Sequence, residues 1–256
     1  MKRVVFNQKG GVGKTSITCN LAAISAARGL RTLVVDLDVQ GNTTHYLVGE
    51  IDADAFPAEA QGAAGLFKQT VGSRKMHQNP DSFVWETPWE NLFLLPSSPV
   101  LTQLERELES RYKIYKLRDA LQKLDAEYDR VYIDTPPNFN FYSKSALIAA
   151  DTVLVPFDCD SFARQSLYSL MDNIAELQED HNPDLAVEGI VINQFNSQAR
   201  LPGELVAELE EEGYPVCATY LSASVKMRES HHEHRPLVDL APSHKLTQQF
   251  LESGRD

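Results

Sequence analysis

Close to its N-terminus the chain reads Gln8-Lys9-Gly10-Gly11-Val12-Gly13-Lys14-Thr15-Ser16. The apolar run 3–7 precedes this stretch, and a segment with helical spacing of apolar residues follows it. A strand, a glycine-rich loop and a helix in this order let backbone N–H groups and a helix N-terminus converge on phosphate. In such a loop Lys14 reaches the β- and γ-phosphates and Thr15 binds Mg²⁺ through its hydroxyl. Residues 9–16 are therefore predicted to bind a nucleotide.

Short apolar runs alternate with helical segments along the rest of the chain. We expect strands at 3–7, 32–36, 92–95, 130–134, 152–157, 187–193 and 216–220. Most of these runs are continuously apolar, which is typical of strands buried on both faces. The alternation predicts an α/β fold, with a mostly parallel twisted sheet flanked by helices on both faces.

The length of 256 residues fits one large α/β domain, so we expect a single domain spanning residues 1–256. Residues 50–90 break the alternation and are rich in proline and glycine. This stretch is predicted to be an insertion within the domain, with a short helix at 63–70 and an edge strand at 82–86.

The composition limits the environment and the partners. Three isolated cysteines suggest neither a disulfide framework nor a thiolate metal site, and no signal peptide or membrane-spanning run is apparent. We therefore expect a cytoplasmic protein. With 36 acidic and 24 basic side chains, the formal net charge is −12. That charge repels nucleic acid and anionic lipid, so contact with either requires a local basic patch.

Three carboxylates stand where predicted parallel strands end. Asp36 and Asp38 follow the strand at 32–36, and Asp134 ends the strand at 130–134. The carboxyl ends of parallel strands border the crevice in which ligands bind in such sheets. These three carboxylates are therefore predicted to face the ligand.

The loop departs from the common phosphate-binding pattern, because Gln8 replaces a glycine and Lys9 adds a second lysine. This arrangement resembles the deviant Walker A motif of the ParA/MinD family of ATPases. The resemblance implies a homodimer that encloses two ATP molecules, with Lys9 of one subunit touching the phosphates bound by the other. Lys9 would then act on the transferred phosphoryl group as an arginine finger does.

The resemblance extends to the other motifs. The run 36–42 matches the family's Asp-x-Asp-Pro-Gln-Gly-Asn motif, with Val39 in place of the proline. By this resemblance Asp36 helps to hold Mg²⁺, Asp38 orients the attacking water and Asp134 is the Walker B aspartate. Asn193 would read the adenine edge, although Leu221-Ser222 replace the family's Ile-Pro pair nearby. The implied cofactors are ATP, ADP and Mg²⁺.

The C-terminal tail carries few large apolar residues and is not basic, so the membrane-binding MinD type is not expected. The resemblance favours the ParA/Soj-like branch. Its members bind non-specific DNA as ATP dimers, and a ParB-like or cargo-adaptor protein stimulates their hydrolysis. This branch implies nucleoid association in a bacterium, and positioning or segregation of DNA or of a protein cargo.

DNA contact requires cations, and the candidates are Arg200, Lys226, Arg228 and Arg235. Two alternatives stay open: an ATPase switch that acts on another protein without DNA, and an ATP-dependent metabolic ligase of the same fold. A metal site at residues 231–234 (His-His-Glu-His) is a weaker option, because adjacent helical histidines point in different directions.

Overall fold

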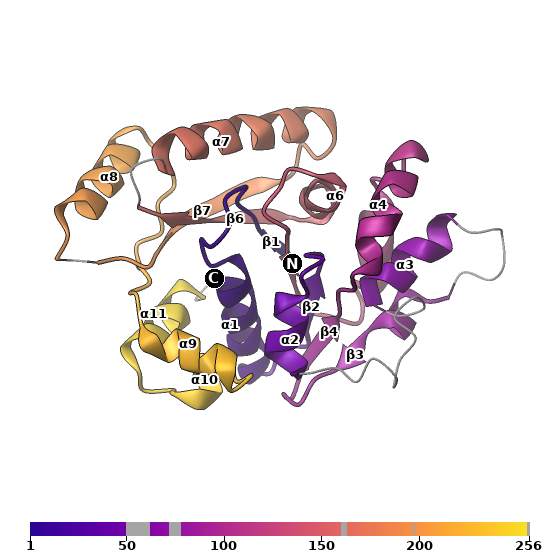
Figure 1. Ribbon diagram of the computed structural model, residues 1–256, viewed down its shortest axis with the longest axis horizontal. Coiled ribbons are helices and arrows are strands. Elements are labelled where there is room, and N and C mark those ends of the chain that lie inside the picture. Colours follow the sequence, from indigo (N-terminus) through magenta and orange to yellow (C-terminus); the bar gives the residue numbers. More distant parts are fainter. Residues whose placement is uncertain (50–61, 72–77, 160–162, 197, 255–256) are drawn as a thin grey trace.

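The computed structural model describes residues 1–49, 62–71, 78–159, 163–196 and 198–254. Its centre is a seven-stranded sheet with the order β3-β4-β2-β5-β1-β6-β7 (Figure 1). The strands are β1 (Lys2–Val5), β2 (Thr32–Asp36), β3 (Trp85–Glu86), β4 (Leu92–Leu95), β5 (Arg130–Asp134), β6 (Thr152–Asp158) and β7 (Ala186–Asn193). All neighbouring strands are parallel except β3, which pairs antiparallel with β4. The predicted α/β class with a mostly parallel sheet is confirmed.

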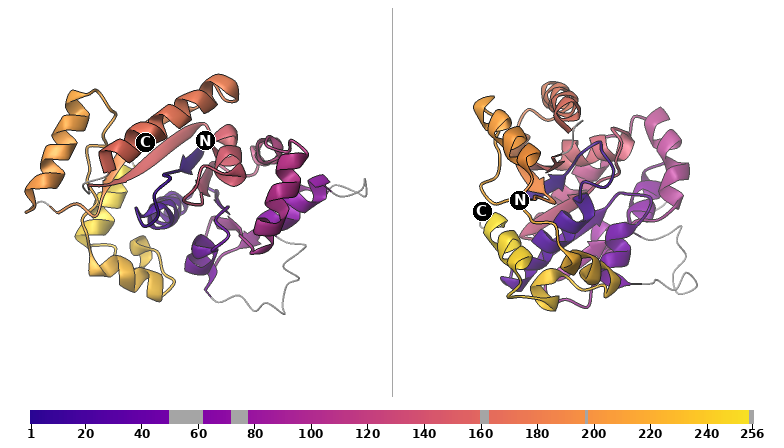
Figure 2. Two further views of the ribbon diagram at one scale, coloured as in Figure 1. Left: turned by 45° about the horizontal axis from the view of Figure 1, so that its top comes forward. Right: turned by 60° about the vertical axis from the view of Figure 1, so that its left-hand side comes forward.

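Helices cover both faces of this sheet (Figure 1 and Figure 2). They are α1 (Lys14–Ala27), α2 (Asn42–Val48), α3 (Gly62–Val71), α4 (Val100–Ser110), α5 (Lys116–Leu124), α6 (Phe141–Ala149), α7 (Ala163–Asp180), α8 (Arg200–Glu211), α9 (Val225–His232), α10 (Leu237–Leu240) and α11 (Lys245–Ser253). In the part of the chain that the structure describes, no helix is both long enough and apolar enough to cross a bilayer.

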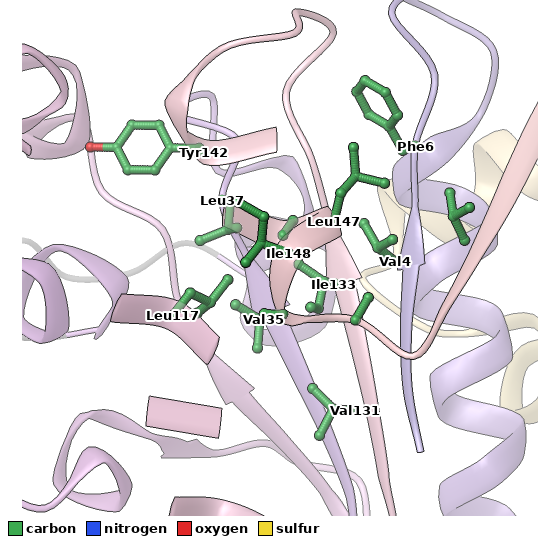
Figure 3. Packing of buried hydrophobic residues seen from close by; sticks show 14 of the residues in the cluster. Val4, Phe6, Val35, Leu37, Leu117, Val131, Ile133, Tyr142, Leu147 and Ile148 are labelled. Carbon is green, nitrogen blue, oxygen red and sulfur yellow. The ribbon is translucent and has the colours of Figure 1, made fainter. Parts of the chain in front are cut away.

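Successive side chains of the central strands enter two different hydrophobic clusters. Val4 packs in the cluster that includes residues of α3 to α8, whereas Val5 packs with α1, α2, α10 and α11. Figure 3 shows the first cluster, where Val35 and Ile133 lie near Ile148 of α6. Both faces of the strands are therefore buried, which accounts for their continuously apolar sequence.

The expected strand at 216–220 is wrong. Within this segment Val216 forms an isolated bridge with Ile190 of β7, and a second isolated bridge, between Ser222 and Phe195, lies just beyond both segments. The N–H groups of Cys217 and Leu221 donate to the carbonyls of Ile190 and Ile192. Four positions separate the donors and two separate the acceptors, so two extra residues bulge out and interrupt the ladder.

Only parts of the predicted insertion at 50–90 fall within the described residues, and segments 50–61 and 72–77 lie outside them. The helix predicted at 63–70 is confirmed as α3. The edge strand predicted at 82–86 is shortened to β3, because the 3₁₀ helix η1 (Pro80–Phe83) takes its first half. Pro80 fixes the first helical φ, and the Asn79 side chain caps the N–H of Asp81.

Candidate functional site

The glycine-rich loop between β1 and α1 is held from both sides. Gly11 and Gly13 have φ values of +77° and +93°, in the left-handed region that favours glycine. On one side the Asn7 side chain accepts from the N–H of Lys9 at 2.9 Å. On the other side Asn193 Nδ2 donates to the Val12 carbonyl at 2.8 Å. A Cβ atom added at Gly13 would lie 2.2 Å from that Nδ2 atom and would displace the Asn193 amide from the Val12 carbonyl.

Lys14 lies within this loop. Its side chain is only 7% exposed, and its Nζ donates to the Lys9 carbonyl at 3.0 Å. Burial lowers the pKa of Lys14, and the nearby carboxylates of Asp134 and Asp38 oppose that shift. The ammonium group is therefore largely withdrawn from water beside the position predicted for phosphate.

Two buried carboxylates lie beside the loop, because β2 and β5 are neighbours and Asp36 is paired in register with Asp134. The hydroxyls of Thr15 and Thr43 each donate to Asp134 Oδ2 at 2.7 Å. Thr44 donates to Asp36 Oδ2 through both its N–H, at 2.8 Å, and its hydroxyl, at 2.7 Å. The structure thus brings together Thr15, Asp36 and Asp134, the three predicted Mg²⁺ residues.

The electrostatics of this pair fit a divalent cation. Burial, with the neighbouring Asp134 carboxylate, raises the pKa of Asp36 to about 8. Burial also raises the pKa of Asp134, against the stabilising hydrogen bonds from Thr15 and Thr43. Carboxylate and hydroxyl oxygens are hard ligands of the kind that Mg²⁺ prefers, and a cation here would relieve the repulsion between the carboxylates.

The raised pKa of Asp36 makes stability depend on pH. A folded-state pKa above the unfolded value means that the folded protein binds more protons, so this stability is present at low pH and is lost as the pH rises towards 8. Urea denaturation of the protein without metal or nucleotide is expected to show an unfolding free energy that falls by about 1 kcal/mol per pH unit between about pH 5 and 8. Asp36→Asn should flatten this slope, whereas Asp184→Asn at an exposed position should keep it. Equal slopes in both variants would contradict the assignment.

Asp38 lies in the turn that follows β2. Its N–H donates to Asp36 Oδ1 at 3.2 Å, and its own carboxylate accepts from the N–H of Gln40 at 3.0 Å. The Ser97 hydroxyl donates to its backbone carbonyl at 2.6 Å. Although Asp38 is only 8% exposed, it is less enclosed than the Asp36–Asp134 pair.

A cavity of about 580 Å³ opens beside the loop, between α1 and the segment 222–231. Gly11, Gly13, Ser16 and Asn193 line one side of it. Its position next to the phosphate loop fits the nucleoside end of a bound nucleotide. Asn193 lines this cavity, and its amide donates to the loop carbonyl of Val12, while its contact with adenine stays a prediction.

Sequence reasoning missed two threonines that hydrogen-bond to the carboxylate pair. Thr43 and Thr44 bind Asp134 and Asp36 respectively from the start of α2. Their position directly after Gly41-Asn42, at the end of the aspartate motif, is the signal that could have identified them.

The four predicted DNA-binding cations do not form one patch. Arg200 belongs to α8 and pairs with Glu204 at 2.5 Å. Lys226 pairs with Glu229, and Arg235 pairs with Asp239 at 2.6 Å. Arg228 instead lines the cavity beside the phosphate loop. Three of the cations thus lie around α9, and each of Lys226 and Arg235 has an acidic neighbour.

Comparisons with known proteins agree with this geometry. A family model described as an AAA domain matches residues 2–187. The chromosome partitioning protein ParA of Myxococcus xanthus is 33% identical over 256 residues, covering 98% of this chain and 86% of that protein.

Two solved structures have the same fold. Cobyrinic acid a,c-diamide synthase from Mycobacterium smegmatis, with bound ADP and magnesium, superposes with a TM-score of 0.76 and 29% identity over 91% of both chains. A variant of McdA from Cyanothece in complex with ATP superposes with a TM-score of 0.84 and 22% identity, over 98% of this chain and 94% of that one. Each of these two proteins was solved with an adenine nucleotide bound.

Proposed function

Because this chain belongs to the ParA/MinD family of P-loop ATPases, we propose that it is a Mg²⁺-dependent ATPase of the ParA/Soj-like type. In this proposal ATP drives dimerisation, the dimer binds DNA without sequence preference, and a partner protein stimulates hydrolysis. The cycle positions or segregates DNA or a protein cargo. The observation that carries the proposal is the meeting of Lys14, Thr15, Asp36 and Asp134 at one edge of the sheet.

Each residue has a defined part in this reaction. Lys14 and the N–H groups of the loop bind the phosphates, and Thr15, Asp36 and Asp134 hold Mg²⁺, which supplies charge stabilisation to the phosphoryl oxygens. Asp38 orients the attacking water, since it borders the pair and is less enclosed. Lys9 acts on the nucleotide of the opposite subunit. Its backbone is fixed at both ends, because its N–H donates to Asn7 and its carbonyl accepts from Lys14.

The proposed DNA contact depends on folding and dimerisation rather than on bulk charge, because the net charge is −12. Lys226, Arg228 and Arg235 all lie on or just after α9, and dimer symmetry would double this set. The bacterial nucleoid is the expected location of the ATP-bound form. A ParB-like protein or a cargo adaptor is the expected activator.

Fluorescence anisotropy of a random-sequence DNA duplex tests this proposal. With Mg²⁺ and ATP we expect binding that weakens steeply between 50 and 200 mM salt, by about tenfold or more, because phosphate contacts release counterions. With ADP, or without nucleotide, we expect no binding at the same concentrations. If no state binds DNA while nucleotide binding is confirmed separately, the protein acts on another protein instead.

A second candidate is an amide-forming ligase, since a structural neighbour with 29% identity is a diamide synthase. Phosphate release distinguishes the two reactions. An ATPase switch releases phosphate from ATP and Mg²⁺ alone, and faster with DNA and its partner. A ligase requires a carboxylic acid and a nitrogen donor before it releases phosphate.

A further inference from the structure

The side chain of His231, at the end of α9, joins the phosphate loop to α2. Its Nε2 lies 2.8 Å from the hydroxyl of Ser16, the last residue of the loop motif. Its ring stacks on that of Tyr46 in α2, with the ring centroids 4.2 Å apart and an interplanar angle of 13°. One half-buried imidazole therefore contacts both the nucleotide loop and the helix that carries Thr43 and Thr44.

A buried polar network fixes the position of this ring. The Tyr46 hydroxyl shares a hydrogen bond with Ser230, the residue before His231. Asn20 Nδ2 donates to the Tyr46 hydroxyl at 3.1 Å and to the Ser16 carbonyl at 2.8 Å. Asn20 Oδ1 accepts from the N–H of Leu237 at 2.8 Å. These bonds hold α1, α2, α9 and α10 together around the ring, so the imidazole has a defined orientation.

His231 also lines the cavity beside the loop, together with Ser16, Gly13 and Asn193. Ser16 lies in the first turn of α1, where N–H groups are directed at phosphate. We propose that His231 is a nucleotide-contact residue, whose imidazole binds the α-phosphate that ATP and ADP share. This inference rests on the proposed nucleotide site, and it adds a ligand from α9 that the phosphate loop does not supply.

The chemistry of the ring suits this role. Burial, with the nearby His234, lowers the pKa of His231, so the imidazole is neutral at pH 7 and one of its nitrogens donates a hydrogen bond. The Ser16 hydroxyl forms a hydrogen bond with Nε2 of this ring. When a phosphate lies at the loop, the same nitrogen and the same hydroxyl face the same ligand. Binding then requires only an exchange of hydrogen bonds at a preformed site.

His231→Phe separates the hydrogen bond from the stacking, because phenylalanine keeps a ring against Tyr46 and removes both nitrogens. We expect its Kd for a fluorescently labelled ADP and for a non-hydrolysable ATP analogue to rise by the same factor, about tenfold. His231→Gln, which restores an N–H donor, should recover most of the affinity.

His232→Phe is the matched control, because it places the same ring at the next position of α9, which is exposed. It should bind both nucleotides as the wild type does. Melting temperatures of the three variants check that each is folded. Wild-type affinity in a folded His231→Phe protein, or an effect on the ATP analogue alone, would overturn the α-phosphate contact. Failure of the wild type to bind either nucleotide would instead overturn the proposed function.

Discussion

A Lys14→Ala protein is expected to lose tight binding of both ATP and ADP, with Kd rising about 100-fold or more. Lys14 is almost fully buried in the loop, and its ammonium group lies near the Asp36–Asp134 pair. Its removal takes away a charge-assisted phosphate contact in a site shielded from water, where such contacts are strongest. It also removes one of the cations that offset repulsion between the phosphates and the carboxylates.

Titration with a fluorescently labelled ADP and with the ATP analogue measures this loss. Lys123→Ala removes a lysine from the exposed face of α5 and should bind both nucleotides normally. Circular dichroism and the melting temperature establish that the Lys14→Ala protein is folded. An unchanged Kd in the folded variant would exclude Lys14 as the phosphate-binding lysine.

A Lys9→Ala protein is expected to behave differently, because it should bind ATP and fail to hydrolyse it. A cation that acts only on the charge developing during phosphoryl transfer contributes to the transition state rather than to the bound nucleotide. By analogy with arginine fingers supplied by a second protein, we expect turnover to fall about 1000-fold, with Kd for ATP within a few-fold of the wild-type value.

The concentration dependence of turnover tests the cross-subunit role. Wild-type turnover per subunit should rise with protein concentration as dimers form, whereas Lys9→Ala turnover should stay low at every concentration. Lys123→Ala again serves as the control that keeps wild-type behaviour. Normal hydrolysis by the Lys9→Ala protein would remove Lys9 from the reaction and would leave the loop with a single functional lysine.

The central parts of the fold and site could be predicted because their determinants are contiguous in the sequence. A buried parallel strand must be apolar along its whole length, and its carboxyl end must lie at the ligand edge, which locates Asp36 and Asp134. Gly11 and Gly13 of the loop have positive φ values for which few other residues are suited. Each of these requirements restricts the residue types at neighbouring positions, so it can be recognised in a short stretch of sequence.

Other features depend on contacts between distant segments. His231 meets Ser16 across 215 positions of sequence, and nothing in its neighbours indicates a nucleotide cavity. Threonine hydroxyls have many uses, so Thr43 could not be assigned to Asp134 before β2 and β5 were known to be neighbours. At 216–220 the residues have strand propensity, but two extra residues between Cys217 and Leu221 interrupt pairing with β7.

The two hydroxyls at the start of α2 belong to consecutive residues, yet they bind carboxylates on two different strands. The hydrogen bonds to Asp134 and to Asp36 therefore both depend on the position of the same helical turn. A small rotation of this helical turn would change the lengths of both hydrogen bonds at once. A ligand that moved either carboxylate would also pull on the threonine bound to it. The first turn of α2 therefore links the surroundings of two carboxylates that lie on neighbouring strands.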